Sequence, residues 1–234
     1  MSPLNRNKGK GTTMQPDVDQ AVSVQEMSKV ERLMWDVYGH VRDNGARMYE
    51  GGASVEEALY LRSVTRLTEA KTVAEIGFNV GFSSIAFLES GPDVTVVSFE
   101  LDRRHAVELA KDFVDERYPG RHELVIGNSL QTVPAYAETK AGTFDLVFVD
   151  GGHEYEIATA DILNSCRLAR PGGIIVVDDL TPWHPWGVGP SQAWEEAIGN
   201  GLIEPVESFV DGKIVDTITE PGDRAWAAAR VTAG

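Results

Sequence analysis

Residues 72–100, TVAEIGFNVGFSSIAFLESGPDVTVVSFE, decide the fold. A short apolar run ends at Gly77, and a second glycine, Gly81, follows four residues later, before a helical pattern that reaches Gly91. A second apolar run then ends in an acid, Glu100. The order strand, glycine loop, helix, strand predicts a βαβ unit in a parallel sheet.

The same alternation continues beyond this unit. The sequence predicts strands at residues 122–128, 144–150 and 173–179. A predicted helix begins at Tyr155 and ends in the Pro-Gly-Gly of residues 171–173. No helix is predicted between residues 129 and 143. Nearly continuous Val, Ile and Phe predict strands covered on both faces. Residues 203–218 and 224–231 read as strands joined by turns, an antiparallel pair at the sheet edge. We therefore expect an α/β fold of the Rossmann-like type, with a mostly parallel, doubly wound sheet, an antiparallel C-terminal edge and an N-terminal helical extension.

The N-terminal part divides into two regions. Residues 1–22 are polar and aperiodic and predict a disordered or partner-ordered arm, whereas residues 23–70 carry two helical patterns that could serve as a lid or in dimerisation. Ser54 with Glu57 three residues later forms a capping-box pattern, and we expect an apolar face of Ala58, Leu61, Val64 and Leu67 on the second helix. Residues 71–234 form the main domain.

Composition excludes several classes. The 234 residues carry a formal net charge of −15, which disfavours nucleic acid as a partner because a diffuse acidic surface repels phosphates. A single cysteine excludes an intramolecular disulfide. No apolar run is long enough for a membrane span and no secretory signal opens the chain, so the expected location is the cytoplasm.

Polar side chains stand at the carboxyl end of every predicted parallel strand. In open α/β sheets these ends meet at one edge, where ligands bind. The strand ends are Glu75 to Gly77, Glu100, Gly127-Asn128-Ser129, Asp150 to His153, and Asp178-Asp179. Their convergence predicts a single site.

The glycine loop points to a particular kind of ligand. The dinucleotide fingerprint would place its middle glycine at position 79, where this chain has Asn79. Glu75 would repel a phosphate and could instead help to hold an ammonium group, while Glu100 has the placement of an acid that bonds ribose hydroxyls. Adenosine with an amino-acid tail fits these features better than NAD.

The combined motifs E-x-G-x-x-x-G, a strand-end acid, FDLVFVDGGH and RPGG-x-x-x-x-DD resemble the class I S-adenosylmethionine-dependent methyltransferases over residues 54–231. The pattern is similar to the metal-dependent catechol and caffeoyl-CoA O-methyltransferases, and in style to the macrocin-type sugar O-methyltransferases of antibiotic pathways. The resemblance implies Mg²⁺ ligands at Asp150, Asp178 and Asp179 and a base at His153. It implies cofactor contacts from Glu75, Gly77, Asn79, Gly81, Ser83, Glu100, Asn128, Ser129 and Asp150.

Elementary chemistry agrees with this metal site. Three converging carboxylates repel one another unless a cation joins them, and hard oxygen ligands suit Mg²⁺. Trp183, His184 and Trp186 follow the acidic pair and predict a stiff aromatic loop that could contact substrate, with His184 as a second candidate base. The expected function is O-methylation of a small hydroxylated metabolite. A metal-independent N- or carboxyl-methyltransferase, a non-catalytic nucleoside-binding module of the same fold, and a homodimeric state remain open.

Overall fold

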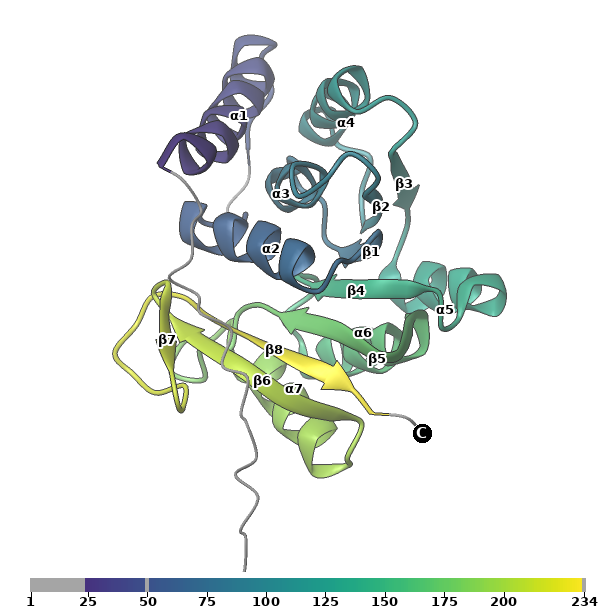
Figure 1. Cartoon of the computed structure of the whole chain (residues 1–234), viewed down its shortest axis with the longest axis vertical. Coiled ribbons are helices and arrows are strands. Elements are labelled where there is room, and N and C mark those ends of the chain that lie inside the picture. The colour runs from purple at the N-terminus through teal and green to yellow at the C-terminus, as the bar shows by residue number, and fades with distance from the viewer. Residues whose placement is uncertain (1–23, 49–50, 233–234) are drawn as a thin grey trace, which may run out of the picture.

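The computed structural model describes residues 24–48 and 51–232, so the predicted arm lies outside the described residues. Its centre is an eight-stranded sheet with the order β3-β2-β1-β4-β5-β8-β6-β7 (Figure 1). The five parallel strands are β1 (Thr72–Ile76), β2 (Thr95–Glu100), β3 (His122–Ile126), β4 (Phe144–Val149) and β5 (Ala169–Val177). The antiparallel strands are β6 (Ile203–Val210), β7 (Lys213–Val215) and β8 (Ala225–Val231). This arrangement confirms the predicted fold class.

Helices cover both faces of the sheet (Figure 1). One face carries α1 (Val24–Asp43), α2 (Val55–Leu67), α3 (Phe82–Leu88) and α4 (His105–Arg117). The other carries α5 (Ser129–Lys140), α6 (Tyr155–Leu168) and α7 (Val188–Gly199). Each layer has its own apolar core, because the alternate side chains of the central strands point to opposite faces.

The strand order reverses between β1 and β4, which lie side by side. Ile76 pairs with Val149, and the ladder continues past the strand ends with a hydrogen bond from the Asp150 N–H to the Ile76 carbonyl at 2.9 Å. Gly77 and Asp150 are consequently neighbours. A reversal of this kind opens a crevice at the carboxyl ends of the strands.

Several details differ from the sequence-based expectations. Helix α5 was not predicted, because Pro134 interrupts its pattern and it buries only Val133 and Ala137. Helix α6 ends at Leu168, and the Arg-Pro-Gly-Gly segment instead opens β5, where the pairing with β4 shifts register. Leu67 is 64% exposed because α2 ends there, so its predicted burial is wrong.

The C-terminal strands are antiparallel as predicted, but the last one is not at the edge. Strand β8 lies between β5 and β6, and β7 forms the edge. Its five consecutive buried residues, Ala225 to Ala229, match a strand covered on both faces. Within residues 24–48 and 51–232, no helix combines the length and hydropathy that a bilayer crossing requires.

Candidate active site

The glycine loop between β1 and α3 is fixed by close backbone packing. Gly77 has φ +100°, and a Cβ atom there would lie 2.0 Å from the carbonyl oxygen of Asp150. Gly81 has φ +76° and caps α3, and a Cβ there would meet the Phe78 ring at 2.9 Å. Asn79 also has positive φ, +48°. The first glycine thus joins the loop directly to the end of β4, a role that the sequence motif did not indicate.

Glu100 holds the loop from the end of β2. Its Oε2 accepts hydrogen bonds from the N–H groups of Phe78 at 3.2 Å and Asn79 at 2.8 Å. Its Oε1 lies 3.3 Å from Nη2 of Arg104. The carboxylate is largely buried but still borders a cavity. It is therefore oriented by the loop before any ligand enters.

That cavity has a volume of about 340 Å³ and lies beyond the carboxyl ends of β1 to β4. It brings together most of the predicted cofactor residues. These are Gly77, Asn79, Ser83, Glu100, Asn128, Ser129 and Asp150, with His153 also on the wall. The lining also includes Ile76, Gly127, Gly151 and Gly152 from the predicted strand ends. Residues that the sequence did not single out complete it: Gly51, Gly52, Ala53, Phe78, Val80, Phe82, Phe99, Leu101, Arg104 and Ile157.

The cavity has both apolar and polar walls. Phe78, Phe82 and Phe99 offer ring surfaces, and the Asn128 side chain caps α5 by accepting a hydrogen bond from the Leu130 N–H at 2.9 Å. The backbone N–H groups at the start of α5 are hydrogen-bond donors, and the Glu100 carboxylate is a hydrogen-bond acceptor. Such a mixture suits a nucleoside with a polar tail.

Glu75 and Gly81 lie behind this wall. The Glu75 carboxylate is fully buried and accepts hydrogen bonds from the hydroxyls of Ser84 and Ser98, the latter at 2.5 Å. Burial raises its pKa to about 7, and the serine bonds oppose that rise. The Ser98 hydroxyl also lies 2.7 Å from Nε2 of His122, whose pKa burial lowers to about 3. Glu75 is thus part of a polar network beneath the glycine loop.

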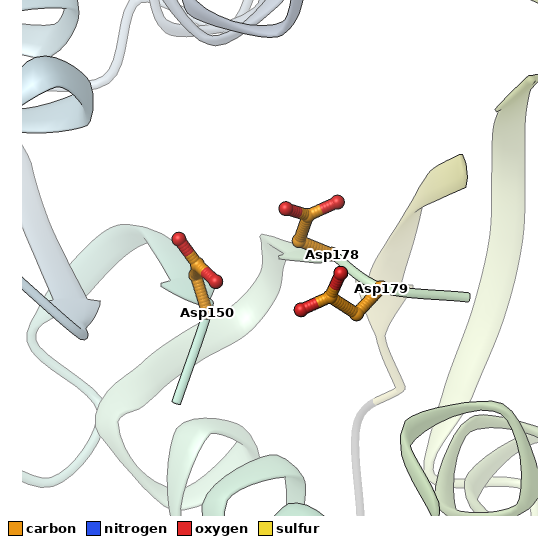
Figure 2. Close-up of side chains that lie close together, drawn as sticks. All are labelled: Asp150, Asp178 and Asp179. Atoms are coloured by element: carbon orange, nitrogen blue, oxygen red, sulfur yellow. The ribbon is translucent and has the colours of Figure 1, made fainter. Parts of the chain in front are cut away.

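Three aspartates meet next to the cavity. Asp150 follows β4, and Asp178 and Asp179 follow β5 (Figure 2). One carboxylate oxygen from each lies within 4.8 Å of the others. Asp179 has φ +59°, a strained backbone that turns its side chain toward the other two. The structure brings together the three residues predicted to hold a cation.

The electrostatics of this group suit a divalent ion. Burial raises the pKa of Asp150, and the neighbouring charge of Asp178 raises it further. The pKa of Asp178 is raised by burial and then by Asp179. A hard cation removes this repulsion and takes carboxylate oxygens as ligands. The residues therefore fit Mg²⁺ or a similar ion.

His153 lies beside the aspartates and is half-exposed. Its Nε2 is 2.8 Å from Oδ2 of Asp179, and this hydrogen bond is the main reason that its pKa is raised above the usual value. The start of α7 packs on its backbone, since a Cβ at Gly189 would lie 2.2 Å from the His153 carbonyl oxygen. The His153 ring is thus close to the three aspartates and is hydrogen-bonded to one of them, Asp179.

Two further charged residues approach the aspartates and were missed from the sequence. Glu57, on α2, is fully buried, and its pKa is raised well above the usual value by burial and by the charges of Asp178 and Asp150. Arg224, just before β8, places Nη1 3.8 Å from Oε2 of Glu57. Ser54 does accept a hydrogen bond from the Glu57 N–H at 3.1 Å, as the capping pattern predicted. The sequence did carry one signal for the burial of Glu57, because it lies one helical turn before Leu61 on the apolar face of α2.

The predicted aromatic loop is tied to the segment before β8. Trp183 donates its indole N–H to the Gly222 carbonyl at 2.7 Å, and His184 Nε2 lies 3.2 Å from the same oxygen. His184 and Trp186 stack with ring centres 4.5 Å apart. Among the described residues that line the 340 Å³ cavity, none comes from this loop.

Comparisons with known proteins agree with this geometry. Residues 74–180 match a family described as "Methyltransferase domain". A catechol O-methyltransferase from Mycobacterium tuberculosis is 35% identical over 128 residues, which cover 54% of this chain and 56% of that protein. A protein assigned as an O-methyltransferase in Mycolicibacterium vanbaalenii is 30% identical over 197 residues, 81% of each chain.

A solved structure extends the likeness to the whole fold. The O-methyltransferase TomG from Streptomyces achromogenes, involved in tomaymycin synthesis and solved with S-adenosylmethionine, superposes with a TM-score of 0.67 at 25% identity, covering 86% of this chain and 90% of its own. The chain spans little more than half the length of two catechol O-methyltransferases that it matches, from Mycobacterium tuberculosis and Niastella koreensis. The relative that matches over 81% of both chains and the shared fold place this chain in the S-adenosylmethionine-dependent O-methyltransferases of the catechol and caffeoyl-CoA O-methyltransferase family.

Proposed function

We propose that this chain is itself an O-methyltransferase that uses S-adenosylmethionine and a divalent cation, Mg²⁺ by preference, to methylate a hydroxyl of a small molecule. The observation that carries the proposal is the position of Asp150. Asp150 borders the 340 Å³ cavity, and its carboxylate belongs to the three-aspartate group. A cofactor in the cavity and an acceptor at the aspartates would therefore meet at this residue.

The binding roles follow from the side chains. Glu100 accepts hydrogen bonds from the ribose hydroxyls, and the loop of Gly77 and Asn79 lies against the amino-acid tail. Asn128 and Ser129 lie at the adenine end, at the start of α5. Glu75 supports the loop from below through Ser84 and Ser98. When bound, S-adenosylmethionine supplies an electrophilic methyl group, and the cation lowers the pKa of the acceptor hydroxyl.

Asp150, Asp178 and Asp179 hold the cation and orient the acceptor. His153 takes the proton of the acceptor hydroxyl. To accept this proton, the His153 ring must be neutral and must break its hydrogen bond to Asp179. The ring would be free to turn once Asp179 binds a cation instead. Trp183, His184 and Trp186 face the acceptor from the loop after Asp179, and His184 is the alternative base.

The acceptor class that we favour is a neutral hydroxylated metabolite, in natural-product biosynthesis. The aromatic loop suits a ring-bearing acceptor, and TomG, a structural relative, is involved in tomaymycin synthesis. We further propose that residues 23–70 complete the site, since Gly51, Gly52 and Ala53 border the cavity, and that the chain acts as a homodimer in the cytoplasm.

A screen of phenolic, sugar and hydroxylated amino-acid acceptors with methyl-labelled S-adenosylmethionine, with and without EDTA, tests the proposal. We expect label transfer to an acceptor oxygen that EDTA abolishes and Mg²⁺ restores. Asp178→Asn should abolish transfer, whereas Asp93→Asn, at an exposed turn, should not. Transfer that survives chelation would favour a metal-independent N- or carboxyl-methyltransferase, and cofactor binding without any transfer would favour a non-catalytic module.

A further inference from the structure

His122 is a buried histidine at the start of β3, the edge strand of the parallel half of the sheet, and the roles proposed above do not use it. Its Nε2 lies 2.7 Å from the Ser98 hydroxyl, which donates a hydrogen bond to Oε1 of Glu75 at 2.5 Å. A hydroxyl has one proton, so a Ser98 that donates to Glu75 accepts from the Nε2–H of His122. This hydrogen bond restricts the orientation of the imidazole ring.

One face of the imidazole ring stacks on the ring of Phe78. The two ring centres lie 5.1 Å apart and the two planes differ by 25°. The other end of the Phe78 ring is also confined, because a Cβ atom at Gly81, the residue that caps α3, would lie 2.9 Å from it. Phe78 is therefore held between β3 and the start of α3.

Phe78 connects this stack to the cofactor cavity. It directly follows Gly77 in the glycine loop, and its N–H donates a hydrogen bond to Oε2 of Glu100 at 3.2 Å. The next N–H, that of Asn79, donates to the same oxygen at 2.8 Å. Phe78, Asn79 and Glu100 all border the cavity. A displacement of the Phe78 ring would therefore move the two N–H groups that orient the Glu100 carboxylate.

A histidine is a costly residue for packing alone at this position. Nδ1 of His122 is buried and has no hydrogen-bond partner within the described part of the chain. A buried polar atom without a partner lowers stability, and an apolar side chain would fill the same space without this cost. The imidazole combines a flat face with an N–H that lies in the plane of the ring, so Ser98 can fix the plane on which Phe78 stacks.

We propose that His122 is a positioning residue for cofactor binding: its ring, oriented by Ser98, holds Phe78 and keeps the glycine loop in the conformation that binds S-adenosylmethionine. The inference rests on the binding of S-adenosylmethionine in the cavity, as proposed above. A loop that is already ordered loses little conformational freedom when the ligand binds, so its preorganisation raises affinity. His122 itself lies behind the cavity wall and acts through Phe78.

The test measures S-adenosylmethionine binding to the full chain by calorimetry, without acceptor. His122→Gln keeps a side-chain N–H for Ser98 but removes the flat ring, and we expect its dissociation constant to rise by roughly 3- to 10-fold, the range that one aromatic pair spans. His122→Phe restores a flat ring against Phe78 and should bind within about twofold of wild type. Val94→Ala, which opens a cavity in the same apolar layer just before β2, is the control for lost stability and should bind as wild type.

Hydrogen exchange followed by NMR separates positioning from a general loss of stability. In the cofactor-free chain, the N–H groups of Phe78 and Asn79 should exchange faster in His122→Gln than in wild type or Val94→Ala, since their hydrogen bonds to Glu100 open more often.

Unchanged affinity or unchanged exchange of these two N–H groups in a folded His122→Gln overturns the inference alone. Equal weakening of binding in His122→Phe or in Val94→Ala does the same. A wild-type chain that binds no S-adenosylmethionine overturns the proposed function as well. Should His122→Gln not fold, His122→Leu, which has no flat face, is measured in the same way.

Discussion

Replacing Gly77 by alanine tests whether the glycine loop and the aspartate group are mechanically joined. The added Cβ would lie 2.0 Å from the Asp150 carbonyl oxygen, and the residue already has φ +100°. Neither partner can easily move away, because the Gly77 N–H is bonded to the Phe99 carbonyl at 2.8 Å and the Asp150 N–H to the Ile76 carbonyl at 2.9 Å. Backbone strain and steric overlap together should cost about 3–5 kcal/mol.

Gly142→Ala is the matched control for this substitution. Gly142 has φ +68°, and a Cβ there would have no atom within 4 Å, so the variant isolates the conformational penalty, about 1–2 kcal/mol. Urea unfolding followed by circular dichroism gives both free energies of unfolding. Calorimetry with S-adenosylmethionine and Mn²⁺ should show that Gly77→Ala weakens binding of both, because relief of the overlap must displace Asp150. If the free energies of unfolding of the two variants differ by less than about 1 kcal/mol, the inference that the Gly77 and Asp150 backbones are in close contact is wrong.

The remaining predictions concern single side chains. Glu100→Ala should weaken S-adenosylmethionine binding by tens of fold in calorimetry, since a hydrogen bond to a charged group is worth roughly 1.5–3 kcal/mol, and unchanged affinity would remove the ribose role. His153→Ala should lower kcat by roughly 10²–10⁴-fold with cofactor and Mn²⁺ binding intact, whereas near-normal turnover would transfer the role of base to His184. In wild type without metal, NMR should find the pKa of His153 above its usual value, because Asp179 stabilises the protonated ring. Addition of Mg²⁺ should lower this pKa. The rate of methyl transfer should accordingly rise with pH and then level off. His122→Gln should make the free energy of unfolding fall less steeply as the pH is lowered. The pKa of His122 is lowered to about 3 in the folded chain, so below about pH 6.5 the unfolded chain binds a proton that the folded chain does not bind. In wild type this difference lowers the free energy of unfolding by about 1.4 kcal/mol per pH unit. An equally steep curve in the variant would show that another group controls acid unfolding.

The position of the site was predictable because its causes are local. Alternating strands and helices fix a parallel sheet, and parallel strands bring their carboxyl ends to one edge. The acids at the ends of β4 and β5 therefore had to meet, and the structure brings Asp150, Asp178 and Asp179 together. Helix α5 was missed because its apolar signal is weak and Pro134 lies inside it.

The sequence by itself determined the sheet, the glycine loop and the shared edge, since these depend on periodicity and on turn residues within short segments. Tertiary structure alone decided which acids face one another across the fold. Glu75 points away from the cavity into a serine and histidine network, whereas Glu57, which resembled a helix-capping residue, is fully buried, where burial and the charges of Asp178 and Asp150 raise its pKa. The reason is physical: the direction of a buried side chain is set by the packing of elements that are distant along the chain, and no local pattern records it.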